Sequence, residues 1–172
     1  MNTFLPYEDF DKSAYCLDRC RLGKERIEVL TMLKTLYGES NSWSSHPALL
    51  MWNGYHESLV EYGLCICNEW IRRGYKDSCL GKIKQYAGIH VVSPIWLGCP
   101  AFHASHRQTL LFKKPDWYSQ FGWSEEPKYL YVWPIDKSGL SDKVQEWLLE
   151  EPVPWERIQR MEQFWEEKYE TL

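Results

Sequence analysis

The chain has 172 residues, of which 44% are hydrophobic and 26% are charged, and its formal net charge is −4. This length allows one compact domain with a sizeable core, and no apolar run approaches the ~20 residues that span a bilayer. The first residues lack the basic and apolar regions of a signal peptide, so we expect a cytoplasmic protein.

The negative charge is concentrated in the last part of the chain. Residues 135–172 hold five Lys or Arg against ten Asp or Glu, whereas residues 1–134 hold 15 against 14. We therefore expect a helical domain over residues 1–134 and an acidic helical extension over 135–172 that packs on the domain or on a partner. A near-neutral domain excludes nucleic-acid binding by overall charge, so any such site has to be a local basic patch.

The first predicted helix covers residues 13–38. Projected at 100° per residue, its leucines and one valine form an apolar stripe, and Arg21, Lys24 and Glu28 lie together on the opposite side. Arg26 falls within the apolar stripe, where a buried guanidinium needs a partner.

The rest of the chain also predicts mainly helices, so the fold class is mainly α, with irregular aromatic-rich loops. Pro47 opens the second helix in its first turn. The further predicted elements are helices over 48–73, 77–86 and 101–114, an irregular segment over 89–100, a short strand over 128–133, and two tail helices over 140–151 and 151–172.

Glu28 is the first candidate for chemistry. With Lys24 four residues before it and Arg21 seven before it, it forms either an exposed ion pair, worth ~0.3 kcal/mol, or a catalytic carboxylate. In the second case the carboxylate stabilises or deprotonates a cationic intermediate. Periodicity alone favours the exposed pair.

Three histidines each have two interpretations. His46 precedes a predicted helix N-terminus, where it either caps the helix or lies beside a bound phosphate. His103 and His106 are either core or capping residues, or they form a substrate-binding face together with Arg107. No third metal ligand accompanies them and the six cysteines lack zinc-site spacing, so we expect no metal and no other cofactor.

Two cations and two aromatic residues follow one another near residue 115. Lys113 and Lys114 suit contacts with phosphate, and Trp117 and Tyr118 suit stacking on bases. These four residues are the candidates for a nucleic-acid interface.

Seven short motifs, each weak alone, occur between residues 3 and 134. They are "TFLPY", "LDRCRLGKERIE", "HPALLMWNGY", "WIRRGY", "WLGCPAFHASHR", "KKPDWY" and "YLYVWP". In this order they resemble the pyrimidine-dimer DNA glycosylase and abasic-site lyase family, which comprises the phage endonuclease V type and its bacterial relatives.

The resemblance implies a single compact helical domain of the endonuclease V type that binds damaged double-stranded DNA. It also implies that an N-terminal α-amine attacks C1′ of the damaged nucleotide, that a Schiff base forms, and that β-elimination cuts the strand. Glu28 matches the family's essential glutamate. The amine belongs to Met1, or to Asn2 if Met1 is removed, and Lys24 is a less favoured substitute.

The resemblance also extends the set of binding residues. Family cations near the glutamate match Arg21, Lys24 or Arg26, and the family's DNA-contacting aromatic pair matches Trp117 and Tyr118. The expected substrate-binding residues are Arg21, Lys24, Arg26, His46, His103, His106, Arg107, Lys113, Lys114, Trp117 and Tyr118.

Two other functions stay open from the sequence. A near-neutral domain suits an N-glycosidase or related enzyme that acts on a free or modified nucleotide in the same pocket. The amphipathic tail suits a non-enzymatic binding module that associates with a protein partner, or with itself, through its C-terminal helix. For the DNA enzyme we expect a place in the cytoplasm, at the nucleoid or in a phage-infected cell.

Overall fold

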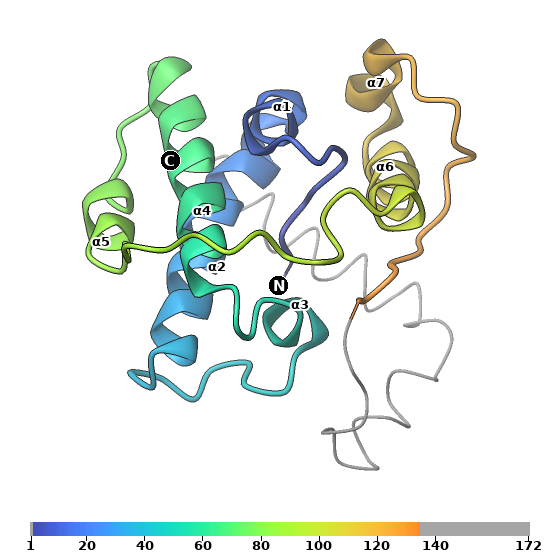
Figure 1. The fold of residues 1–172 in the computed structure, drawn as a ribbon. Coiled ribbons are helices and arrows are strands. Elements are labelled where there is room, and N and C mark those ends of the chain that lie inside the picture. Colours follow the sequence, from blue (N-terminus) through green and yellow to red (C-terminus); the bar gives the residue numbers. More distant parts are fainter. Residues whose placement is uncertain (1, 135–172) are drawn as a thin grey trace. The chain divides into compact units, whose positions relative to one another are not determined.

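The computed structural model describes residues 2–134, and Met1 and residues 135–172, which include both predicted tail helices, lie outside this part of the chain (Figure 1). The described residues form helices and no strand, so the mainly-α prediction is confirmed. None of these helices is both long and apolar enough to cross a membrane. In chain order they are α1 (Phe10–Cys16), α2 (Arg19–Leu36), α3 (Pro47–Leu50), α4 (His56–Arg72), α5 (Leu80–Lys84), α6 (Pro100–Lys113), α7 (Pro115–Tyr118) and a 3₁₀ helix (Ser119–Phe121).

The first predicted helix is in fact two helices, because the chain changes direction at Leu17 and Asp18. Leu17 is extended, with φ −66° and ψ 138°. The Asp18 carboxylate caps α2 by accepting hydrogen bonds from the backbone N–H groups of Cys20 and Arg21, at 3.0 and 3.3 Å. Since Asp is a preferred N-cap, the Leu-Asp step is the sequence signal for this boundary.

The second predicted helix is also divided, because residues 51–55 separate α3 from α4. Gly54 has a φ of +83°, a left-handed conformation that glycine adopts without strain and that an α-helix does not allow. Helix α3 is therefore only four residues long.

Helices α2 and α4 pack against each other at the centre of the described domain (Figure 1). A Cβ atom on Gly23 of α2 would lie 3.0 Å from the Trp70 ring, and a Cβ on Gly63 of α4 would lie 2.7 Å from Val29 Cγ1. This close approach explains the glycine inside α2, which costs about 1 kcal/mol of helix propensity relative to alanine.

Residues 128–133 do not form the predicted strand. The backbone N–H groups of Leu130 and Val132 donate to the hydroxyl groups of Thr109 and Ser105 on α6, at 3.2 and 3.1 Å. These backbone groups are therefore satisfied by helix side chains and not by a neighbouring strand.

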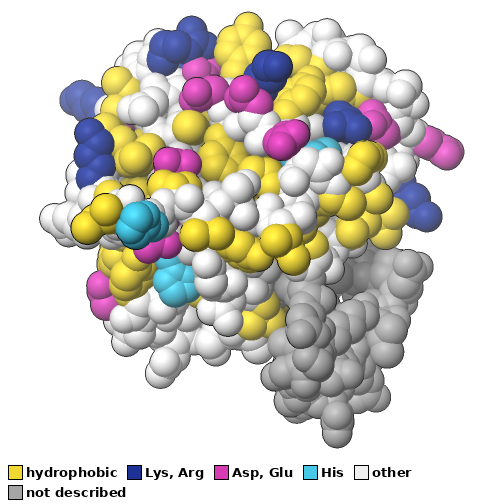
Figure 2. Space-filling view, in the orientation of Figure 1, with side chains coloured by type: hydrophobic (Ala, Val, Ile, Leu, Met, Phe, Trp, Pro, Cys, Tyr) yellow, Lys and Arg dark blue, Asp and Glu magenta, His cyan; other side chains and the backbone are white. Residues whose placement is uncertain are grey.

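The irregular segment predicted over residues 89–100 has neither helix nor strand before Pro100 and crosses the face shown in Figure 2. Ile89 and Ile95 are 95% and 91% exposed, and hydrophobic side chains lie across the middle of this face. Basic and acidic side chains are intermixed around them, so the face shown carries no patch of a single charge.

Candidate active site

Residues 2–6 form an extended segment (Figure 1). All five residues are buried. Helix α6 holds the segment from one side. The Leu5 N–H donates to Nδ1 of His106 at 3.1 Å, and Nδ1 of His103 donates to the Leu5 carbonyl at 2.7 Å. The guanidinium of Arg107 donates to the Pro6 carbonyl, also at 2.7 Å.

The predicted substrate-binding role of these two histidines does not fit their positions. His103 and His106 are 5% and 0% exposed, so neither faces a substrate. Burial lowers the pKa of His106 to about 3, with the nearby charges of His103 and Arg107 acting in the same direction. Of the two interpretations, the structure favours core residues.

Helix α4 and the turn before it hold the segment from the other side. The indole N–H of Trp52 donates to the Thr3 hydroxyl at 3.0 Å, and the hydroxyl of Tyr62 donates to the Phe4 carbonyl at 3.0 Å. The start of the described chain is thus fixed by side chains that the sequence analysis did not associate with a site.

Glu28 lies where this fixed segment begins. Its Oε2 atom accepts a hydrogen bond from the backbone N–H of Asn2 at 3.1 Å. Its Oε1 atom is 3.3 Å from the ammonium nitrogen of Lys24. Glu28 is only 8% exposed, so its pair with Lys24 is not the ordinary solvated pair that periodicity favoured.

A second carboxyl group, that of Glu25, lies one helical turn before Glu28. Glu25 is 1% exposed, and its Oε2 atom is 3.3 Å from the Tyr62 hydroxyl. Burial raises its pKa well above the ordinary value, and the negative charge of Glu28 raises it further, while Lys24 acts in the opposite direction. Glu25 was not among the predicted site residues, because a glutamate beside an apolar stripe ordinarily reaches solvent.

Aromatic side chains enclose the same region. Burial raises the pKa of Tyr131 well above its ordinary value. The Tyr131 and Trp133 ring centroids are 5.2 Å apart, and Trp133 is 6.0 Å from the His46 ring. The alternation of aromatic residues over 129–133 was the available sequence signal for this wall.

His46 caps α3, as one of its two interpretations predicted. Its Nδ1 accepts a hydrogen bond from the Ala48 N–H at 3.1 Å, and a four-residue helix offers little of the dipole expected to attract a phosphate. Burial, together with the charge of Lys24, lowers the pKa of His46 to about 3, so the ring is neutral at physiological pH. His46 therefore adds a neutral polar group beside Lys24.

The acidic and basic side chains of α2 differ in how far they are buried. Its two acidic residues, Glu25 and Glu28, are buried, whereas Arg19 and Lys34 are exposed and Lys24 is partly exposed. The charged side chains of α2 that reach solvent are therefore cations.

Arg26 does not reach Glu28, contrary to its expected place among the substrate-binding cations. Its guanidinium pairs with Asp77 at 2.6 Å and lies 4.1 Å from the centroid of the Trp70 ring. The buried guanidinium thus has its partner in the segment before α5, and Arg26 is 8% exposed. This arrangement makes Arg26 part of the core.

Arg21 lies nearer to the aromatic wall. It pairs with Asp18 at 2.8 Å, and its charge reaches Tyr131, whose pKa it lowers against the larger effect of burial. It remains partly exposed, so a role in substrate binding fits its position.

Trp117 and Tyr118, the aromatic pair expected to stack on DNA, form hydrogen bonds within the protein. Tyr118 is 0% exposed, and its hydroxyl donates to the Asp18 carboxylate at 2.6 Å. The indole N–H of Trp117 donates to the Cys16 carbonyl at 2.9 Å. Tyr118 therefore has no free ring face for a base, and its prediction as a stacking residue is wrong.

The two neighbouring lysines end α6. The Lys113 ammonium lies 5.0 Å from the centroid of the Tyr129 ring, and Tyr129 contacts Tyr131 with centroids 5.5 Å apart. Lys114 is exposed at the end of the helix.

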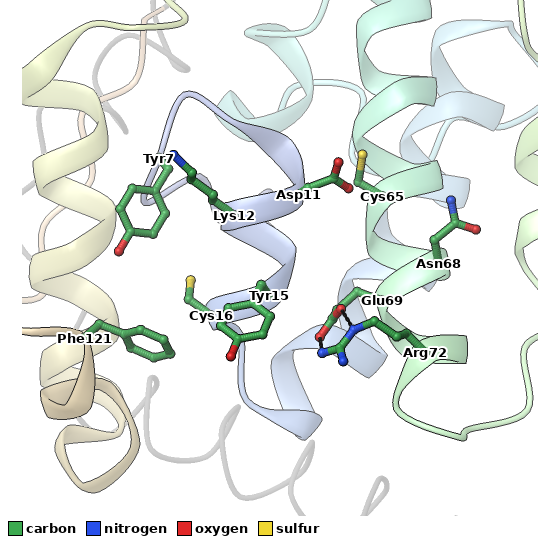
Figure 3. A pocket seen from close by; sticks show the side chains of 10 residues that line it. All are labelled: Tyr7, Asp11, Lys12, Tyr15, Cys16, Cys65, Asn68, Glu69, Arg72 and Phe121. Carbon is green, nitrogen blue, oxygen red and sulfur yellow. Dashed lines mark hydrogen bonds and ion pairs between the residues drawn. The ribbon is translucent and has the colours of Figure 1, made fainter.

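A cavity of about 870 Å³ lies elsewhere, between α1, α4 and the 3₁₀ helix (Figure 3). Tyr7, Tyr15 and Phe121 give it aromatic walls, and the ion pair of Glu69 and Arg72, 2.6 Å apart, lies at its edge. None of the predicted site residues lines it. Among residues 2–134, no group of three or more His, Cys, Asp or Glu side chains is arranged to hold a metal ion.

Comparison with known proteins addresses the first half of the chain. A family model described as pyrimidine dimer DNA glycosylase matches residues 1–82, a range that includes Lys24, Glu25, Glu28 and helices α1 to α5 up to residue 82. No curated protein and no solved structure matches the chain. The match covers slightly less than half of the chain, and it supports the family resemblance that the sequence motifs predicted.

Proposed function

We propose that this protein is a DNA N-glycosylase with associated abasic-site lyase activity, acting on pyrimidine dimers or another altered base in double-stranded DNA. The family match supports the glycosylase activity. One contact supports the mechanism, because the backbone nitrogen of Asn2 lies 3.1 Å from Glu28 Oε2. An acid is thus held against the beginning of the described chain.

The proposed reaction begins with attack of a neutral α-amine on C1′ of the damaged nucleotide. The N–C1′ bond forms, the glycosidic bond breaks, and the base leaves with the bonding electron pair and takes up a proton. Loss of a proton from the nitrogen and opening of the sugar ring give a Schiff base. An α-amine has a pKa of ~7.7–8, so a useful fraction is unprotonated at neutral pH.

Glu28 has two roles in the proposed reaction, one in stabilising positive charge on the sugar and one in removing a proton. Its carboxylate stabilises the cationic sugar and Schiff base, and it accepts the C2′ proton while the 3′ phosphate leaves in β-elimination. Lys24 binds the Oε1 atom and leaves Oε2 on the side of Asn2. The cations on the outer surface of α2 supply phosphate contacts for the duplex.

The nucleophilic amine is assigned to Met1, which lies outside the described residues, or to Asn2 if Met1 is removed. In the second case the nitrogen that bonds to Glu28 is itself the nucleophile. Lys24, with Nζ 3.3 Å from Glu28 Oε1, is the alternative nucleophile. Intact-mass spectrometry shows whether Met1 is retained, and peptide mapping of a reduced adduct shows which amine reacted.

The proposal is tested by borohydride trapping on labelled, UV-irradiated duplex DNA. Wild type should give a covalent adduct and a strand nick, and Glu28→Gln should lower both by about 100-fold or more. The matched control is Glu61→Gln, at an exposed glutamate of α4, which should react like wild type.

Three outcomes would contradict this proposal. Folded wild type that neither nicks nor becomes trapped would remove the DNA glycosylase and lyase assignment. Reaction with free nucleotides but not with duplex would favour the N-glycosidase alternative. Unchanged activity in Glu28→Gln would remove Glu28 from the mechanism.

A further inference from the structure

Glu25 is a buried carboxyl group with no cation bound to it among residues 2–134. It is 1% exposed, and its Oε1 atom has no hydrogen-bond partner in this part of the chain. Its neighbour Lys24 pairs instead with Glu28. A buried carboxylate ordinarily needs a cation or several hydrogen bonds, and within residues 2–134 no ion pair and only the contact with Tyr62 is found for Glu25.

The hydrogen bonds of Tyr62 indicate where a proton is needed. The Tyr62 hydroxyl lies 3.0 Å from the Phe4 carbonyl and 3.3 Å from Glu25 Oε2. A hydroxyl has one proton to donate, and the Phe4 carbonyl can only accept. One proton cannot serve both contacts, and a protonated Glu25 would resolve this by donating its own proton to the Tyr62 oxygen.

The groups that face Glu25 from each packed element agree with this arrangement. On α2 these are Glu28, whose negative charge opposes a second one, and Lys24, which pairs with Glu28. The positive charges of Lys24 and of the N-terminal amine lower the pKa of Glu25, against the larger effect of burial. From α4 comes Tyr62, whose pKa burial raises well above the ordinary value, so the phenol stays protonated. From the segment after α7 comes Tyr131, which is likewise raised by burial and stays neutral.

We propose that Glu25 and Glu28 form a carboxyl pair in which Glu25 is the neutral, proton-holding member and Glu28 the carboxylate. Glu25 is then a positioning residue. Its hydrogen bond with Tyr62 helps to fix the buried segment over residues 2–6, and because it is neutral it adds no second negative charge beside Glu28. Loss of its proton at alkaline pH turns the site off. This inference rests on the proposed function for its effect on catalysis, but not for the protonation of Glu25.

The alkaline loss of activity has two causes. An ionised Glu25 draws the Tyr62 proton away from the Phe4 carbonyl, which loosens the segment that brings Asn2 to Glu28. A second negative charge also favours the protonated form of a neighbouring amine, which is not nucleophilic. No step here needs a cofactor or an additional reactant.

The first test measures the proton directly. Infrared spectra of protein carrying carboxyl-labelled glutamate should show a protonated carboxylic acid band at pH 7, and Glu25→Gln should remove it. Glu61→Gln, the exposed control, should retain the band. A folded wild type without this band at pH 7 would overturn the inference, whether or not the protein acts on DNA.

The second test uses thermal unfolding. A raised pKa in the folded state means that the contribution of Glu25 to stability is present below its ordinary pKa and is lost as pH rises towards the folded value. Glu25→Gln keeps the size, the neutrality and a donor for Tyr62. The variant should therefore melt at a higher temperature than wild type at pH 8, and the difference should shrink at pH 4.

The third test is the pH dependence of adduct trapping. Glu25→Gln should react within about threefold of wild type at pH 7, and its activity should persist at alkaline pH where that of wild type declines. If Glu25 had only a structural role, the substitution would not change the pH at which activity declines on the alkaline side. A folded Glu25→Gln protein that has lost its activity at pH 7 would show that an ionisable group is required, and the inference would be wrong.

Discussion

The backbone N–H of Leu5 donates a hydrogen bond of 3.1 Å to Nδ1 of His106, a residue 101 positions later in the chain. Because Nδ1 accepts this bond, the imidazole is in its neutral form with the proton on Nε2. The bond fixes the segment whose first described residue, Asn2, reaches Glu28. A buried histidine without access to substrate thereby sets the geometry of the candidate site.

Replacing His106 by phenylalanine is expected to lower the free energy of unfolding by about 1–3 kcal/mol, because the buried Leu5 N–H loses its acceptor. The folded pKa, about 3, lies below the ordinary 6.5, so this histidine's contribution to stability is present above pH 6.5 and is lost as pH falls towards 3. The variant should therefore also lose part of the acid sensitivity of wild type.

Urea unfolding at pH 5 and pH 7 measures both effects of the His106 substitution. The control is His90→Phe, since His90 is exposed in the loop after α5 and its replacement should change neither value. A His106→Phe protein as stable as wild type at pH 7 would show that the bond to Leu5 contributes nothing.

The spacing of residues within one helix was sufficient to predict only part of the candidate site. The spacing of Lys24 and Glu28 along one helix predicts their ion pair, which the structure contains. The burial of Glu28 depends on the segment over 2–6 and on the aromatic residues over 129–133, which approach from both ends of the described chain. Periodicity within one helix carries no information on such distant contacts.

The same reason explains two residues that were misassigned. Arg26 was identified as a guanidinium that needs a partner, but Asp77 lies 51 positions away and no local pattern connects the two. Tyr118 follows the exposed Lys114 by four residues, yet its hydroxyl bonds to Asp18, 100 positions before it. Their sequence neighbours suggested that Arg26 and Tyr118 lie at a binding surface, but in the structure both side chains pack in the interior.

Gly23→Ala is expected to destabilise the protein by about 1–3 kcal/mol, although alanine has the higher helix propensity. The added Cβ would lie 3.0 Å from the Trp70 ring, so the buried ring or the helix backbone would have to shift by a few tenths of an ångström. Gly81→Ala in α5 is the matched control, because its Cβ meets nothing within 4 Å and should stabilise the protein by up to about 1 kcal/mol. Equal shifts in melting temperature for both variants would contradict this account of the interface.

Arg26→Met is expected to lower the free energy of unfolding by about 3 kcal/mol, since it leaves Asp77 buried without its cation. Adding Asp77→Asn should recover part of this loss, and a double-mutant cycle from urea unfolding measures the coupling. Both proteins, when folded, should trap DNA at a rate within about threefold of wild type. A specific loss of trapping with unchanged stability would return Arg26 to the substrate-binding residues.

Lys34→Gln is expected to weaken duplex binding by the same factor for UV-irradiated and undamaged DNA. The reason is that an exposed cation on α2 meets phosphates, which are alike in both duplexes. Removing one phosphate contact should make the slope of log K against log salt shallower by about 1, measured by fluorescence anisotropy across a salt series. Lys76→Gln, at an exposed lysine outside α2, should leave the slope unchanged. If the two variants behave alike, the outer surface of α2 does not contact the DNA backbone.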